Sequence, residues 1–545
     1  MTEPVIHVVL ITLLMFLVEA ASRPNIVVIV ADDLGWNDVS FHGSDQISTP
    51  HLDELAYKGV LLKNYYVSPI CTPTRGALMS GRHPIHTGLQ SGVIVGSQPY
   101  GLPLNFTIMP QWLKQLGYRT HMVGKWHLGF FRKEYTPLFR GFESHYGYYL
   151  GCGDYYDHSS EATPEYFGYD FWRNNTVDYT SIGQYSTEIF TKEAVNIINN
   201  HNPSQPLFLY LPYQAVHSGN LPDGNPLQAP QKYIKRFPHI KNTKRRTYAG
   251  MVSALDDAVG TVVDALKTQG LYDNSVILFT TDNGGPANGF DGNAANNFPL
   301  SFEVCVWGVK ATLWEGGVRG TGFLHSPILQ KQGYIAEQMI HVCDWLPTLY
   351  RAAGGNPKQI KDLDGYDLWD MLSNNGKSIR TGMLHNIDPY GPKGALRQGD
   401  YKLLYGKVSK TWGGWYPPWQ VDTDSETYHY DKMDSYNIDE VIKYFSVSNR
   451  NSKEFSMFSP LKIDCGPLPA NASTNCDPEM APCLYHIPSD PCEFHNIADQ
   501  HPDIVQNMMN ILSHYNSTMV PPLNKPQDPA GNPRNNNGAW VPWMK

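Results

Sequence analysis

The clearest pattern along the chain is a series of short apolar runs separated by segments of helical periodicity. The run from Asn25 to Ala31 is rich in β-branched residues and ends at two aspartates, which is typical of a buried parallel strand. Similar runs predict strands at 120–123, 207–211 and 275–281, and helices are predicted at 51–57, 109–116, 185–200 and 247–269. Because strands and helices alternate, we predict an α/β fold with a large, mostly parallel sheet flanked by helices.

The pattern changes near Leu396. Beyond it lie a short strand at 401–405, Pro-rich and aromatic segments, and a late helix at 502–515. The chain of 545 residues is long enough for one large domain and a smaller one. We therefore predict an N-terminal domain over 23–394 and a C-terminal domain over 395–545 that ends in an irregular tail.

The first residues have the character of a secretion signal. An apolar run from Val8 to Val18 is followed by the small residues Ala20, Ala21 and Ser22, which predicts a signal peptide over 1–22. This part of the chain lacks Lys and Arg before the apolar run, so a membrane anchor is the alternative. The run is short for a membrane span, and we expect no stable membrane insertion.

Charge, glycosylation motifs and cysteines agree with export. The formal net charge of -9 argues against nucleic acid as a partner. Asn-x-Ser/Thr motifs predict glycosylation at Asn105, Asn174, Asn471 and Asn516. Of the 8 cysteines, four lie in one Pro- and Asn-rich region, where we expect disulfides, and they are Cys465, Cys476, Cys483 and Cys492. The secretory pathway is the predicted route, with a lysosomal or extracellular destination.

Polar side chains follow two of the predicted strands. Asp32 and Asp33 come directly after the first strand, and Asp282 and Asn283 come directly after another. Such residues also cap turns, which is the simpler interpretation of either pair alone. Because ligands collect at the carboxyl edge of a parallel sheet, two matching strand ends favour a site for Ca²⁺ or Mg²⁺, which prefer oxygen ligands.

The most informative segment runs from Cys71 to Arg75 and has the sequence CTPTR. Read from its residues alone, it is compatible with a buried thiol before a proline-started helix, with Arg75 in an ordinary ion pair. The segment resembles the signature of the formylglycine-dependent sulfatase family, in which a formylglycine-generating enzyme of the secretory pathway oxidises this cysteine. The resemblance continues through Gly81-Arg82 and Thr87-Gly88.

The resemblance implies a specific nucleophile at Cys71. The aldehyde of formylglycine hydrates to a gem-diol, of which one hydroxyl attacks sulfur and the other later expels the bound sulfate. A serine or cysteine lacks that second route. A helix N-terminus, a divalent cation and Arg75 would lower the pKa of the attacking hydroxyl.

Four further residues gain meaning from the same resemblance. Taken alone, Lys125, His127 and Lys310 are typical of polar surface positions, and His217 is typical of a structural histidine. Lys125 and His127 follow a predicted strand and are two residues apart, so they would face the same side of an extended segment. The family motifs imply that Lys125 and Lys310 contact the sulfate, that His127 acts as a base and that His217 is a general acid.

The resemblance extends over the mature chain. Segments 395–404 and 538–544 are similar to the arylsulfatase B branch, which implies an alkaline-phosphatase-like sandwich and a smaller C-terminal domain with an antiparallel sheet and a helix. The family implies one Ca²⁺ per chain, held by Asp32, Asp33, Asp282, Asn283 and the formylglycine at Cys71. Substrates known in this branch include N-acetylgalactosamine 4-sulfate, aryl sulfates and sulfated plant glucosides, and the sequence does not choose among them.

Two other functions are compatible with the sequence. Members of the wider superfamily hydrolyse phosphomonoesters or phosphodiesters at the same sheet edge, and a degenerate sulfatase scaffold could serve as a secreted binding protein. The single predicted metal site favours sulfate, and the presence of every motif residue argues against a non-catalytic protein.

Overall fold

The computed structural model describes residues 23–219, 226–287, 291–301, 308–407 and 461–545 apart from 462, 468, 470 and 473. The predicted signal peptide over 1–22 lies outside the described residues. Within the described ranges, no helix is both long and apolar enough to cross a membrane.

The N-terminal part is built on a ten-stranded sheet. In spatial order its strands are β12 (Tyr334–His341), β2 (Val60–Tyr66), β11 (Gly322–His325), β10 (Ser275–Thr281), β1 (Asn25–Ala31), β9 (Leu207–Pro212), β3 (Arg119–Lys125), β4 (Ser144–Tyr148), β7 (Trp172–Arg173) and β8 (Thr176–Val177). The central strands β10, β1, β9, β3 and β4 are all parallel. β11 enters between β10 and β2 in the antiparallel direction, and β7 and β8 form an antiparallel edge. The predicted, mostly parallel sheet is therefore confirmed.

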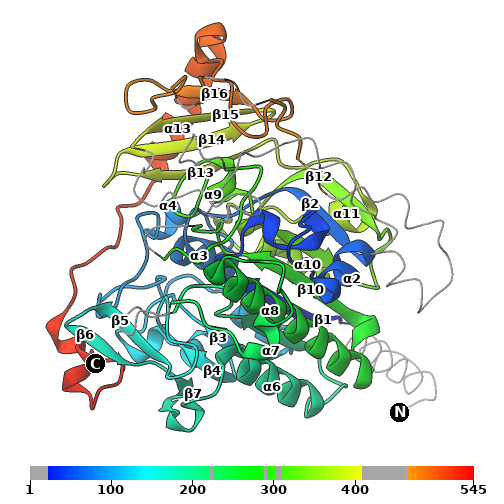
Figure 1. Cartoon of the computed structure of the whole chain (residues 1–545), viewed down its shortest axis with the longest axis vertical. Coiled ribbons are helices and arrows are strands. Elements are labelled where there is room, and N and C mark those ends of the chain that lie inside the picture. Colours follow the sequence, from blue (N-terminus) through cyan, green and yellow to red (C-terminus); the bar gives the residue numbers. More distant parts are fainter. Residues whose placement is uncertain are drawn as a thin grey trace, which may run out of the picture.

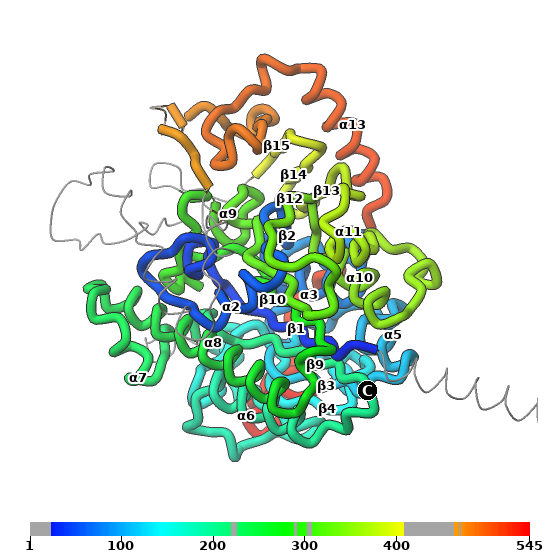
Figure 2. Tube along the Cα trace, turned by 90° about the vertical axis from the view of Figure 1, so that its right-hand side faces the viewer, coloured from blue at the N-terminus to red at the C-terminus, as the bar shows by residue number. Residues whose placement is uncertain are grey.

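Helices cover both faces of this sheet. On one face lie α2 (Pro50–Lys58), α6 (Ser186–Asn199), α7 (Gln231–Ile234) and α8 (Thr243–Thr268), and on the other lie α3 (Cys71–Ser80), α5 (Met109–Gln115), α10 (Trp345–Ala352) and α11 (Trp369–Asn374). Figure 1 shows α6, α7 and α8 in front of the sheet, and Figure 2 shows the two helical layers on opposite sides of it. Along β1, Val27 and Ile29 pack into one core and Ile26 and Val28 into the other. Burial on both faces explains why this strand is apolar throughout.

A second, smaller sheet follows. Its strands β13 (Gly382–Asp388), β14 (Lys393–Gln398), β15 (Tyr401–Gly406) and β16 (Cys483–His486) pair antiparallel in that order. The late helix α13 (Pro502–Thr518) packs on it through Met508 and Leu512. The predicted sheet and helix of the C-terminal part are confirmed. The division at residues 394 and 395 remains a proposal and runs through β14, because the sheet itself begins at Gly382.

Disulfides and the C-terminal tail complete the fold. The clustered cysteines form the bonds Cys465–Cys492 and Cys476–Cys483, as expected for this irregular region. The tail then returns to the N-terminal part and lies beside β5 (Ser159–Thr163) and β6 (Tyr166–Tyr169), as Figure 1 shows in red. Trp540 is fully buried there, and its indole nitrogen donates to the Ser160 carbonyl at 3.0 Å.

Candidate active site

The two polar strand ends meet at one edge of the large sheet. β1 and β10 are parallel neighbours, so the residues that follow them emerge side by side. The Asp33 amide donates to Asp282 Oδ1 at 3.3 Å, and Asn283 Nδ2 donates to Asp33 Oδ1 at 2.6 Å. Asp32, Asp33, Asp282 and Asn283 are all fully buried. The structure thus brings together the four oxygen-bearing residues that the sequence singled out.

Three buried cations pair with these carboxylates. Arg75 Nη2 lies 2.8 Å from Asp282 Oδ2 and 3.3 Å from Asp32 Oδ2. Lys125 Nζ contacts Asp32, and Lys310 Nζ lies 2.7 Å from Asp33 Oδ2.

The charge of these cations follows from their neighbours. Burial alone would lower the pKa of Arg75, Lys125 and Lys310, but the adjacent carboxylates raise all three pKa values above their usual range. The cations therefore stay charged in a buried site, where they can stabilise an anion strongly.

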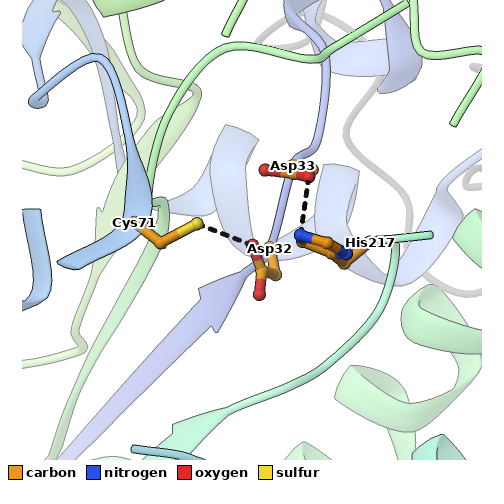
Figure 3. A group of neighbouring side chains, drawn as sticks. All are labelled: Asp32, Asp33, Cys71 and His217. Carbon is orange, nitrogen blue, oxygen red and sulfur yellow. Dashed lines mark hydrogen bonds and ion pairs between the residues drawn. The ribbon is translucent and has the colours of Figure 1, made fainter. Parts of the chain in front are cut away.

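Cys71 opens α3 and faces the carboxylates. Its sulfur lies 3.8 Å from Asp32 Oδ1, and the residue is 2% exposed (Figure 3). Burial raises the pKa of the thiol well above its usual value, although Lys125 and Lys310 act in the opposite direction. As an unmodified cysteine it would be protonated at neutral pH. Its place in the first turn of a helix is favourable for a developing negative charge.

His217 approaches the same carboxylates from the segment after β9. Its Nε2 lies 3.3 Å from Asp33 Oδ2 and 3.2 Å from Lys310 Nζ, and Figure 3 shows the ring turned toward Asp33. Its Nδ1 lies 2.6 Å from the Ser218 carbonyl, so Nδ1 carries the proton and Nε2 is the nitrogen that faces the site.

His127 is buried and lies just beyond the end of β3, not on the strand itself. β3 ends at Lys125 and His127 has a φ of 56°, so these two residues do not lie on one extended segment that would turn both side chains to the same side, as the sequence predicted. Its Nε2 lies 2.9 Å from the Ile94 carbonyl and donates to it, while Nδ1 is buried and has no hydrogen-bond partner among the described residues. Burial and the Lys125 charge lower the pKa of His127 well below its usual value. The ring is therefore neutral, with Nδ1 unprotonated.

Two residues of this site were not identified from the sequence. Asp291 Oδ2 lies 3.1 Å from Lys310 Nζ and 3.8 Å from His217 Nε2. Asn293 Nδ2 donates at 3.0 Å to the carbonyls of both Asp33 and Val216. Both come from a Gly- and Asn-rich stretch after β10, where no local pattern distinguishes a contact residue from a turn residue.

The residues at the sheet edge fit a hard metal ion. Ligand atoms of Asp32, Asp33, Cys71 and His217 lie within 4.8 Å of one another. Asn283 Oδ1 is buried and has no hydrogen-bond partner in the described part of the chain. An orphaned amide oxygen beside buried carboxylates matches the oxygen ligands that Ca²⁺ and Mg²⁺ prefer.

The predicted glycosylation positions are all on the surface. Asn105, Asn174, Asn471 and Asn516 are exposed, and they are distributed over both parts of the molecule. Surface exposure is what attachment of a glycan requires, and glycosylation of these residues stays a prediction.

Comparisons with known proteins show to which family the chain is similar. The family model "Sulfatase" matches residues 24–355. Arylsulfatase J of Mus musculus is 40% identical, with 96% of this chain and 81% of that protein aligned. N-acetylgalactosamine-6-sulfatase of Homo sapiens is 29% identical, with 65% of this chain and 66% of that protein aligned.

Solved structures show the same architecture. Ps i-CgsB superposes with a TM-score of 0.69 at 27% identity and covers 92% of this chain and 94% of its own. PsFucS1 sulfatase from Pseudoalteromonas sp. gives a TM-score of 0.65 at 22% identity, with 97% of each chain covered. The expected alkaline-phosphatase-like fold is thereby confirmed. The chain belongs to the sulfatase family, whose members hydrolyse sulfate esters.

Proposed function

We propose that this sulfatase cleaves sulfate monoesters with a formylglycine derived from Cys71 and with one Ca²⁺. The observation that supports this most strongly is the position of Cys71, in the first turn of α3 and 3.8 Å from Asp32, within reach of the buried Lys125 and Lys310 charges.

The proposed metal ligands are Asp32, Asp33, Asp282, Asn283 and residue 71. When bound there, Ca²⁺ would act as a Lewis acid on the sulfate and on the nucleophile. Formylglycine would supply a geminal diol, and so a second hydroxyl with which to release the sulfate.

The chain's own side chains would then hold charge and move protons. Arg75, Lys125 and Lys310 stay protonated and stabilise the negative oxygens of the transferring group. His217 presents Nε2 to the site and, in the form protonated on both ring nitrogens, would donate the Nε2 proton to the leaving oxygen. His127 keeps Nδ1 unprotonated and would accept a proton from the hydroxyl that remains after transfer. We propose these acid and base roles from ring orientation.

Two measurements on one preparation test the proposal. Protein made in a host that contains formylglycine-generating enzyme should yield a peptide with formylglycine at position 71 by mass spectrometry. The same protein should hydrolyse at least one ester of a panel of 4-nitrocatechol sulfate, an N-acetylgalactosamine 4-sulfate oligosaccharide and a glucosinolate, and should hydrolyse aryl phosphates more slowly. Full activity with an unmodified thiol would refute the nucleophile, and faster phosphate hydrolysis would favour the phosphoesterase alternative.

Removal of the metal should affect both activity and stability. Treatment with a chelator is expected to abolish sulfate ester hydrolysis and to lower the thermal unfolding midpoint, because an ion that binds the native state alone stabilises it by about 3 kcal/mol at 100 times its Kd. Added Ca²⁺ should restore both quantities.

The companion variant for metal removal is Asn283→Leu, which keeps the branched side-chain shape but removes the orphaned oxygen, together with the amide nitrogen that donates to Asp33. This variant should need a higher Ca²⁺ concentration for the same thermal shift. If neither chelator nor Ca²⁺ moved the unfolding midpoint of the parent protein, the proposed site would be wrong.

If the protein passes through the secretory pathway, as we propose, Asn174 in the turn between β7 and β8 should carry a glycan. Asn174 is exposed there, and its Oδ1 accepts a hydrogen bond from the His145 amide at 3.0 Å. Thr176→Ala removes the acceptor motif without changing Asn174. By mass spectrometry, the peptide that contains Asn174 should therefore be lighter than the parent peptide by the mass of one glycan, after allowance for the substitution. An unglycosylated Asn174 in protein secreted by an animal cell would contradict this assignment.

A further inference from the structure

Asp291 is the outermost member of the charged cluster. Its side chain is 23% exposed, whereas the side chains of Lys310, His217 and Asp33 are 1%, 3% and 0% exposed. Asp291 Oδ2 lies 3.1 Å from Lys310 Nζ and 3.8 Å from His217 Nε2. Asp291 therefore stands between solvent and the two residues proposed to serve the ester oxygen.

The position of Asp291 is fixed by its neighbours. Ser218, which follows His217 in the chain, donates from its Oγ to the Asp291 carbonyl at 3.1 Å. Two residues further on, the buried Asn293 donates to the carbonyls of Asp33 and Val216. Hydrogen bonds at Asp291 itself and at Asn293 therefore tie this segment to residues beside the site and hold the Asp291 backbone in place.

Asp291 also changes the balance of charge on the His217 side of the site. Burial alone would raise the pKa of this carboxyl, but Lys310 and His217 hold it below its usual value, so it is ionised. The inner cations and carboxylates are paired, as Arg75 and Lys310 are with Asp282 and Asp33. Asp291 adds a negative charge at the side where the leaving group would lie.

We propose that Asp291 selects sulfate esters whose leaving group carries no second anionic group beside the ester oxygen. This inference rests on the proposed function, because it places the leaving group next to His217 and Lys310. A second anion at roughly 5–7 Å from a partly buried carboxylate is repelled, at an effective dielectric constant of about 20–40, by an energy that corresponds to a roughly ten- to hundredfold loss of affinity. The substrate class would be singly sulfated neutral sugars or phenols, in preference to densely sulfated chains.

The test compares phenyl sulfate with 2-carboxyphenyl sulfate, whose carboxylate adjoins the ester oxygen. Binding is measured by calorimetry in the Cys71→Ala background, which removes turnover, with and without Asp291→Asn. The parent background should prefer phenyl sulfate, and Asp291→Asn should reduce that preference roughly ten- to hundredfold. Moving the carboxylate to position 4 of the ring should weaken the effect in the parent.

Two controls separate charge from folding. Asp264→Asn removes one charge from α8 at a residue whose side chain is 75% exposed, and it should leave the preference unchanged. Asp291→Glu keeps the charge and should keep the preference. Independently of any substitution at Asp291, the preference should shrink as ionic strength rises, because a partly exposed charge is screened.

The outcomes distinguish this inference from the proposed function. An equal loss of affinity for both esters in Asp291→Asn would show a general positioning role and overturn the selection. A preference that Asp291→Asn and salt both leave unchanged would overturn it as well. Binding of neither ester to the parent background would instead reject the sulfate site itself, and the inference with it.

Discussion

Replacing Cys71 with alanine is expected to lower kcat/KM for any sulfate ester substrate by about 10⁴-fold or more, because the variant has no nucleophile and no precursor of one. The folded structure should persist, since the substitution removes one buried sulfur atom at the first residue of α3. The measurement is steady-state hydrolysis together with thermal unfolding of the two proteins.

Cys71→Ser should fail in a more informative way. A serine hydroxyl can attack sulfur but has no second hydroxyl with which to expel the sulfate, so it should be trapped after one transfer. Mass spectrometry of the peptide that contains position 71 should then show one added sulfo group on the serine. Repeated turnover by this variant would contradict the formylglycine mechanism.

Cys343 provides the matched control for both variants. It is a buried thiol, and it lies beside His341, whose Nδ1 is 2.9 Å from its sulfur. It has no x-Pro-x-Arg sequence after it, so Cys343→Ala should keep its activity and its formylglycine at position 71. A comparable loss of activity in Cys343→Ala would show that burial of a thiol, and not its motif, explains the effect.

The largest effect on stability is expected at Lys402, on β15 of the C-terminal sheet. Its fully buried Nζ lies 3.0 Å from Glu315 Oε1 and 2.8 Å from Glu493 Oε1. Lys402→Met would leave two carboxylates buried without their shared cation, which typically costs about 3–5 kcal/mol of unfolding free energy. Denaturant titration of the parent and the variant measures the difference.

The cost of Lys402→Met should depend on pH with a definite sign. Burial raises the pKa of Glu493 from 4.5 in the unfolded chain to about 7, even though Lys402 opposes the shift. A carboxyl with a raised pKa binds its proton more tightly in the native state, so its contribution is favourable at low pH and is lost as pH rises from about 4.5 through about 7. Loss of Lys402 should raise the pKa of Glu493 further, so the free energy of unfolding of the variant should be much lower at pH 8 than at pH 5.

The control is the exposed pair on α2. Lys58 Nζ lies 2.7 Å from Glu54 Oε1 at the surface, and Lys58→Met should cost less than about 1 kcal/mol at either pH. A similarly small cost for Lys402→Met at pH 8, or a larger cost at pH 5, would contradict the electrostatic explanation. Lys402 pairs with Glu315, and Glu315 lies five residues after Lys310 in the chain. Because loss of this pair would disturb the segment that holds Lys310, the Lys402 variant should also have lower activity.

The sequence was most informative where burial constrains the pattern. β1 and β10 have the predicted bounds, because strands covered on both faces must be apolar from end to end. The insertion of β11 between β10 and β2 was not predicted, because the direction and partner of a short strand depend on distant residues.

The residues of the active site likewise fall into those that the sequence pattern could predict and those that it could not. The strand-end residues Asp32 and Asp282 could be predicted, since parallel strands present their ends at one edge. His217 and Lys310 became candidates only through a family resemblance, because single polar residues in loops have no periodicity. Asp291 was missed for that reason, and its role depends on contacts across 74 residues of chain to His217.

The burial of Cys71 has a consequence for the order of events in the cell. Once α3 has docked, the side chain is out of reach of another enzyme, since the residue is 2% exposed. Any enzyme that oxidises Cys71 must act before that moment. Under the proposed formylglycine mechanism, modification of Cys71 therefore competes with folding, and a variant that folds faster would leave more of its molecules unmodified.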